Sequence, residues 1–155
     1  MTSTVGSATL TVTLTEAITL NGYDQGSTNT LTIASVNEVS KRIVTATTTE
    51  QEVLAFGTAV ASGTFLEDKV VYFRITNLDD TNHVVLTFKS EGNHEFAVKL
   101  DKGQSFIYNG DLAGGVVDTM DASASALSLA LEDLVNVTAD ADTASCDLEI
   151  FVACI

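Results

Sequence analysis

The chain has 155 residues, 45% of them hydrophobic, which is enough to bury the core of one domain and too apolar for a disordered chain. Its 21 Asp and Glu residues against 7 Lys and Arg residues give a net charge of −14. This charge disfavours binding to nucleic acids and to anionic membrane surfaces, so we expect neither as a partner.

The N-terminus, residues 1–6, has no basic residue and no apolar segment, so no signal peptide is expected. No apolar run approaches the ~20 residues that a bilayer-spanning helix needs. Every turn must be made without proline, which is absent from the chain. We expect a soluble protein with a single β-sandwich domain over residues 1–155.

The first predicted strands alternate with a period of two. Leu10, Val12 and Leu14 occupy one parity, and Ile18 and Leu20 continue it. Threonines fill the other parity at positions Thr9, Thr11, Thr13, Thr15 and Thr19. Because threonine is β-branched and tolerates a solvated sheet face, we expect strands whose apolar side faces a core. Leu31 and Ile33 continue the pattern, and residues 43–56 are less regular.

The middle of the chain contains the clearest strands. Alternating apolar residues mark strands over 71–76, 84–88, 96–100 and 105–108, and turn-rich segments separate them. The spacing of about ten residues predicts an antiparallel meander.

After the Asn109-Gly110 turn, residues 111–125 are rich in glycine and small side chains and predict a long loop. Residues 126–137 fit either a helix or a strand, and we favour the strand while the helix remains open. The last strand is expected over 147–155. The sum is nine or ten short strands, which predicts an all-β, jelly-roll-like antiparallel β-sandwich.

The last strand is apolar on both faces near its end. Phe151, Ala153 and Ile155 have the parity opposite to the expected core positions, so we predict that they form a subunit interface or lie under another layer of the chain. Cys146 and Cys154 share the core parity. Eight residues of strand place them roughly 26 Å apart, too far for a disulfide between them. We expect two buried hydrophobic side chains.

Catalytic and metal-binding patterns are missing from the sequence, so we expect no enzyme, no cofactor and no metal. His83 and His94 are near turns and have no activated serine or cysteine in a recognisable motif beside them. The acidic segments around residues 79–82 and 140–142 have carboxylates but lack the other ligands of a calcium loop. Three further carboxylates interrupt the apolar pattern, at Glu16, Glu132 and Asp133, and we interpret them as strand-end residues.

Three segments resemble a pattern of small virion proteins from tailed bacteriophages. They are residues 72–79 (YFRITNLD), 82–86 (NHVVL) and 96–106 (FAVKLDKGQSF), and the closing segment 139–149 is similar to the final hairpin of those proteins. A proline that is usual in the turn is Lys102 here. The resemblance implies a β-sandwich capsid cement (decoration) protein without catalytic residues.

Two functions from different classes follow as expectations. The first is a structural virion protein, a homo-oligomer, expected to be a trimer, that stabilises the phage head from outside by contacting the major capsid protein or another virion protein. It would be made in the host cytoplasm and located on the capsid exterior. The alternative is a tail, neck or fibre component with a host-recognition role, including sugar binding. An enzyme or a calcium-dependent sugar-binding domain is disfavoured.

Overall fold

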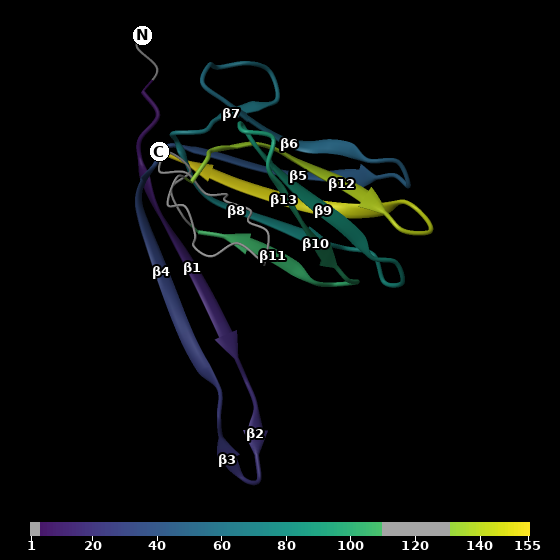
Figure 1. The fold of residues 1–155 in the computed structure, drawn as a ribbon. Helices are drawn as coiled ribbons and strands as arrows, with labels where there is room; N and C mark the ends of the chain where they lie inside the picture. Colours follow the sequence, from purple (N-terminus) through teal and green to yellow (C-terminus); the bar gives the residue numbers. More distant parts are fainter. Residues whose placement is uncertain (1–3, 110–130) are drawn as a thin grey trace, which may run out of the picture. The chain divides into compact units, whose positions relative to one another are not determined.

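The protein is all-β. A computed structural model describes residues 4–109 and 131–155, and in these ranges the chain forms thirteen strands and no helix (Figure 1). The described part of the chain therefore contains no helix that could cross a membrane. Two compact units are present, residues 1–38 with Ile155 and residues 39–154.

The first unit is a long β-hairpin, which we call the hairpin arm (residues 8–36). Strand β1 (Ala8–Glu16) pairs antiparallel with β4 (Ser27–Val36), and beyond them the short strands β2 (Thr19–Leu20) and β3 (Tyr23–Asp24) pair at the tip (Figure 1). The two-residue loop of Asn21 and Gly22 has positive φ values of 51° and 83°, as a tight hairpin turn requires.

The strands of the hairpin arm were expected, but the burial of their apolar side was not. Leu14, Ile18 and Leu20 are exposed to 50%, 55% and 60%. The prediction that this side faces a core is therefore wrong for these three residues. Alternation reports which side chains share a face, but it does not report what covers that face.

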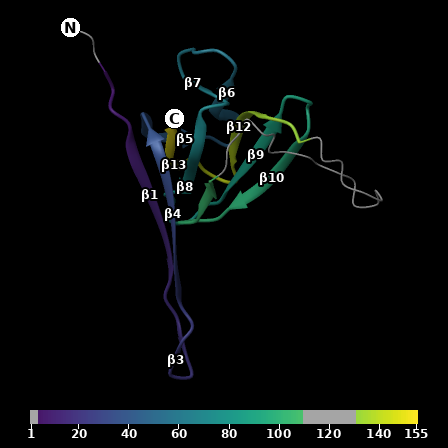
Figure 2. The same ribbon diagram turned by 90° about the vertical axis from the view of Figure 1, so that its left-hand side faces the viewer.

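The second unit consists of two sheets. One contains β5 (Glu38–Ala46), β13 (Cys146–Cys154), β8 (Val70–Asn77) and β11 (Ser105–Tyr108) in that order. The other contains β7 (Thr64–Leu66), β6 (Gln51–Gly57), β12 (Leu134–Ala141), β9 (Val84–Ser90) and β10 (Glu95–Leu100). Figure 2 shows β5, β13 and β8 in one layer and β12, β9 and β10 in the other.

The strand order is that of a jelly roll. From β5 to β13, two pairs of successive strands, β6–β7 and β9–β10, have both members in the same sheet. All the remaining connections in this part of the chain cross from one sheet to the other. The expected meander over residues 71–108 is therefore wrong. Strands β9 and β10 do form a hairpin, but β8 pairs with β11 and β13, so the chain crosses to the other sheet before β9 and returns after β10.

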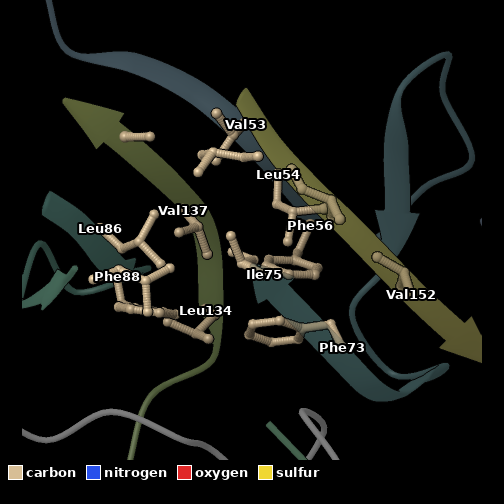
Figure 3. Packing of buried hydrophobic residues seen from close by; sticks show 14 of the residues in the cluster. Val53, Leu54, Phe56, Phe73, Ile75, Leu86, Phe88, Leu134, Val137 and Val152 are labelled. Atoms are coloured by element: carbon tan, nitrogen blue, oxygen red, sulfur yellow. The ribbon is translucent and has the colours of Figure 1, made fainter. Parts of the chain in front are cut away.

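The core lies between these two sheets, and Figure 3 shows its buried side chains pointing toward one another. Phe73 on β8 is at its centre, with ring centroids 5.9 Å from Phe56, 6.4 Å from Phe88 and 5.1 Å from Tyr108. Each sheet thus contributes aromatic rings to one cluster. Alternation along each strand supplies the facing positions, because the side chains at every second residue point inward.

The late part of the chain matches the expectations in part. Strand β12 begins at Leu134, and its neighbours are β6 and β9. Within the described residues 131–137, the strand favoured for residues 126–137 is therefore present over its last four residues. The expected loop 111–125, Gly110 and residues 126–130 lie outside the described residues. Strand β13 begins one residue earlier than expected, at Cys146.

Candidate functional site

The segment that carries the family resemblance is organised by a buried asparagine. Asn77, at the end of β8, has no exposed surface. Its side-chain amide donates hydrogen bonds to the backbone oxygens of Asn82 (2.9 Å) and Leu100 (3.3 Å), and its side-chain oxygen accepts one from the N–H of Asp79 (3.0 Å). One side chain therefore joins the end of β8, the following loop and the end of β10.

The second resembling turn is tied to the same residue. The backbone N–H of Asn77 donates a hydrogen bond to the backbone oxygen of Gln104 (3.0 Å), and the backbone oxygen of Asn77 accepts one from the N–H of Gly103 (3.1 Å). Gly103 has a φ of +70°, a conformation that favours glycine. Lys102, where proline is usual in the resembling pattern, donates its backbone N–H to the Asp101 carboxylate (3.0 Å), a bond that proline could not make. Asn77, Gly103 and Lys102, three of the residues quoted for the resemblance, thus have structural roles in the jelly roll.

The outer face of the sheet β5–β13–β8–β11 has a polar half. Glu149 on β13 is bonded to Arg74 on β8 (2.5 Å) and to Lys41 on β5 (3.0 Å). Thr76 continues the row, with its hydroxyl 2.8 Å from that of Ser105 on β11. The side-chain hydrogen bonds from Arg74 and Lys41 hold the pKa of Glu149 below its ordinary value.

The other half of this face contains the residues predicted as a subunit interface. Phe151 is partly buried and packs edge-on against Tyr72, with ring centroids 5.9 Å apart. Ala153 has no exposed surface, and Ile155 is 40% exposed. Burial raises the pKa of the Tyr72 hydroxyl. Phe151 and Ile155 therefore offer some surface to a partner, whereas Ala153 offers none, and the role of all three in an interface stays a prediction.

A polar hollow of about 470 Å³ lies at one end of the other sheet. Its lining includes Lys89, Ser90, His94, Glu95 and Asn136. Asn136 donates to Glu52 (3.0 Å), and its own side-chain oxygen is buried without a hydrogen-bond partner. Carboxylates, an imidazole, an ammonium group and an amide therefore meet at this end of β9, β10 and β12.

Glu132 clamps the turn beside this hollow. Its Oε2 accepts a hydrogen bond from Ser90 Oγ (2.5 Å) and lies 2.7 Å from His94 Nδ1. These contacts, together with the backbone N–H of Gly92, hold the pKa of Glu132 below its ordinary value. A Cβ at position 92 would lie 2.0 Å from Glu132 Oε1, so a larger residue there would displace this carboxylate from its contacts.

The Ser90, His94 and Glu132 side chains do not have the arrangement of a hydrolytic triad. A nucleophilic serine gives its proton to an imidazole nitrogen that the carboxylate orients from the far side. Here the single hydroxyl hydrogen of Ser90 goes to Glu132 directly, so the carboxylate binds both of the other members. This geometry suits a clamp that holds the β9–β10 turn to the segment before β12.

The two histidines lie at opposite ends of the β9–β10 hairpin, as expected from its pairing. The register joins Val84 to Leu100 at one end and Lys89 to Glu95 at the other. His83 lies at the first end, where its Nδ1 is 3.7 Å from Asp142 Oδ2.

The acidic segments expected to be solvated turns are placed as follows. Asp79 accepts hydrogen bonds from the N–H groups of Thr81 (2.8 Å) and Asn82 (2.5 Å), which lower its pKa. Asp140 lies within β12 and Asp142 follows the strand. In residues 4–109 and 131–155, no group of three or more His, Cys, Asp or Glu side chains is placed to hold a metal ion. The carboxylate of Asp79 thus stabilises the turn in which it lies, through the two backbone hydrogen bonds.

Both cysteines are buried thiols on β13, as the parity argument predicts. Burial raises the pKa of the Cys146 thiol, and the nearby carboxylates of Asp79, Asp147 and Asp142 add to the effect. A raised pKa lowers the thiolate fraction, so Cys146 is poorly suited to nucleophilic chemistry.

Sequence reasoning did not identify Asn77, Gly92 or Glu132 as organising residues. Asn77 and Gly92 are within predicted turns, and Glu132 was noted only for interrupting an apolar pattern. The Asn21-Gly22 dipeptide between apolar strands was a usable hairpin signal that was not applied. Contacts between residues tens of positions apart, such as Ser90 with Glu132, have no local signal in one sequence.

No protein-family model and no curated protein matches this chain. The resemblance to small virion proteins rests on the quoted segments alone.

Proposed function

We propose that this chain is a non-enzymatic structural virion protein, an oligomeric capsid cement or decoration protein that stabilises a phage head from outside. Its partners would be further copies of itself, forming a trimer, and the major capsid protein or another virion protein. It would be made in the host cytoplasm and act on the capsid exterior.

The observation that carries the proposal is where large apolar side chains remain exposed. In the described chain, four of them lie on the hairpin arm, where Leu14, Ile18, Leu20 and Tyr23 are 50–73% exposed, and others, such as Val39, Ile43 and Val60, lie outside it. Exposed apolar surface of this kind marks sites of protein association. At the polar hollow, in contrast, the Ser90 hydroxyl and the His94 imidazole are both engaged by the adjacent carboxylate of Glu132. The arrangement favours a protein that binds neighbours over one that turns over a substrate.

The charge distribution supports the same proposal. All seven Lys and Arg residues lie between Lys41 and Lys102, and the chain as a whole has a charge of −14. An acidic surface resists non-specific adsorption to nucleic acid. A protein that coats a particle filled with a genome benefits from this property, because it remains bound to the shell rather than to released DNA.

Isolated particles test the proposal directly. Antibodies raised against the chain, with quantitative mass spectrometry of purified heads and tails, should find it on heads at a copy number comparable to that of the major capsid protein. Heads stripped of the chain should release their genome at a lower temperature, and adding the purified chain back should restore the original temperature. A chain that is absent from particles, or that leaves the release temperature unchanged, would refute the proposal.

The polar hollow favours a second candidate, a tail, neck or fibre component that binds a host sugar. The hollow is lined by Lys89, Ser90, His94, Glu95 and Asn136, whose polar groups can exchange hydrogen bonds with the hydroxyl groups of a sugar. In this case the chain would be found on tails in few copies, and the purified protein would block infection. An Asn136→Ala variant would lose that blocking activity, whereas Asn109→Ala, at a site outside the hollow, would keep it.

A further inference from the structure

The tip of the hairpin arm carries an asparagine that is followed by a glycine. Asn21 and Gly22 form the two-residue loop between β2 and β3 (Figure 1), with φ values of 51° and 83°. Both residues are exposed, as are Leu20 and Tyr23 on either side of them. Nothing lies within 4 Å of the position that a Cβ of Gly22 would occupy, so no neighbouring group crowds the backbone of this residue.

An asparagine in this setting can react with the backbone of its own chain. The backbone nitrogen of the next residue, once it has lost its proton to hydroxide, attacks the carbon of the side-chain amide. The new C–N bond closes a five-membered succinimide ring, and ammonia leaves. Water then opens the ring at either of its two carbonyl groups, so one amide and one water yield one carboxylate, of aspartate or isoaspartate, and one ammonium ion. A side chain on the next residue hinders the attack, and glycine has none.

Two other asparagines of the described chain lack these properties. Asn93 also has a positive φ, of 63°, but the backbone N–H of the next residue, His94, is donated to Ser90 Oγ (3.1 Å). Asn29 is exposed on β4 of the same arm, but the next residue is Thr30, whose β-branched side chain crowds the attacking nitrogen. Asn93 and Asn29 are therefore internal controls for Asn21.

We propose that Asn21 is a site of spontaneous covalent modification, at which the folded chain converts the side-chain amide to aspartate and isoaspartate through attack by the Gly22 nitrogen. This inference goes beyond the proposed function and does not rest on it, because the reaction needs only this turn and water.

The conversion changes the arm in two ways. Residues 8–36 contain Glu16 and Asp24 and no Lys, Arg or His, so a third carboxylate is added without a cation to neutralise it. Aspartate tolerates the positive φ of this position, so the Leu20–Tyr23 pair is retained in that product. Isoaspartate instead inserts one extra carbon into the backbone of a two-residue loop, and the register of β2 with β3 is lost.

Peptide mapping of the folded, full-length chain tests the proposal. The chain is kept in mildly alkaline buffer, and mass spectrometry follows the loss of each side-chain amide, with Asn21 resolved from Asn109, which also precedes a glycine. We expect Asn21 to convert at least about tenfold faster than Asn29 and Asn93, a difference of about 1.4 kcal/mol in activation free energy. The products should elute with an Asn21→Asp standard and accept a methyl group from an isoaspartyl methyltransferase.

Gly22→Ala is the matched variant, because it hinders the attack and leaves Asn21 in place. We expect it to slow the conversion of Asn21 by about tenfold while the rate at Asn29 stays the same. The comparison within the wild-type chain stands by itself if alanine, which is strained at a φ of 83°, disturbs the turn. A wild-type chain in which Asn21 converts no faster than Asn29, or a Gly22→Ala chain in which Asn21 converts as fast as in the wild type, would overturn the proposal.

Discussion

At the scale of single residues, Asn77 is a buried polar group that links separate parts of the jelly roll. It is fully buried, and three hydrogen bonds of its side chain are to the backbone of the following loop and of the end of β10. Removing the amide would leave buried backbone groups without hydrogen-bond partners. Because water cannot reach these groups, the loss of the hydrogen bonds would lower the free energy of unfolding.

We therefore expect Asn77→Ala to lower the free energy of unfolding by about 2–4 kcal/mol. Asp80→Ala, an exposed site in the same loop, should change it by less than about 0.5 kcal/mol. Urea unfolding followed by circular dichroism measures both. Equal midpoints for the two variants would show that the Asn77 contacts contribute nothing.

Gly92 tests the clamp formed by Glu132. An alanine Cβ at position 92 would lie 2.0 Å from the Glu132 carboxylate, so Gly92→Ala should displace that side chain and cost about 1–3 kcal/mol. In a Glu132→Ala background the same substitution should cost less than about 0.5 kcal/mol, because the clashing atoms are gone. A double-mutant cycle of unfolding free energies measures this coupling. Additive effects would contradict the clamp.

Residues of this kind are the hardest to predict from one sequence. Asn77 and Gly92 both lie in segments whose composition already indicates turns. Their contacts with distant residues therefore leave no additional pattern in the sequence. Glu132 contacts Ser90 across 42 positions. The parity of Cys146 and Cys154, in contrast, depends only on the local strand period, and their burial was predicted correctly.

At the scale of elements, the last strand has an apolar outer end formed by Phe151, with Tyr72 beside it, and by Ala153. We expect Phe151→Asp to shift the oligomer toward monomer, because it places a charge in the predicted interface. Ile155→Asp is the matched variant, since Ile155 is 40% exposed at the end of the same strand. Light scattering gives the masses of the two variants. The midpoint of thermal unfolding shows whether Phe151→Asp has also destabilised the single chain by removing the contact with Tyr72. An unchanged mass for both variants would refute the predicted interface.

Strands were easier to predict than their partners. The alternation of residues 71–108 located β8 to β11 closely, because side-chain period is a local property. Pairing of β8 with β11 and β13 depends on which strands bury a common core, and even spacing along the chain favoured the meander instead. The hairpin arm shows the same limit, since its alternation was recognised while the exposure of Leu14 was not.

At the scale of the whole molecule, acid should destabilise the fold. Glu132 and Glu149 have pKa values below the ordinary 4.5 because of side-chain hydrogen bonds, and Asp79 has one below 3.8 because of backbone hydrogen bonds. A carboxyl whose pKa is lower in the folded state binds its proton more readily when unfolded. Its stabilising contribution is therefore present above the ordinary pKa and is lost as the pH falls through the folded value.

We expect the midpoint of thermal unfolding to fall as the pH is lowered from about 5 to about 2. Glu149→Gln should reduce the slope of this decline, because the ion pairs with Arg74 and Lys41 no longer titrate. Calorimetry across this pH range measures both proteins. A wild-type midpoint that rises toward low pH would contradict the assigned pKa directions.

The central claim is that this jelly-roll protein acts by binding copies of itself and its neighbours rather than by turning over a substrate. The mass of the purified full-length chain in solution, measured by light scattering over a range of concentrations, tests it most directly. We predict a trimer with three times the chain mass of 16.3 kDa. A mass of one chain at every concentration would contradict the account.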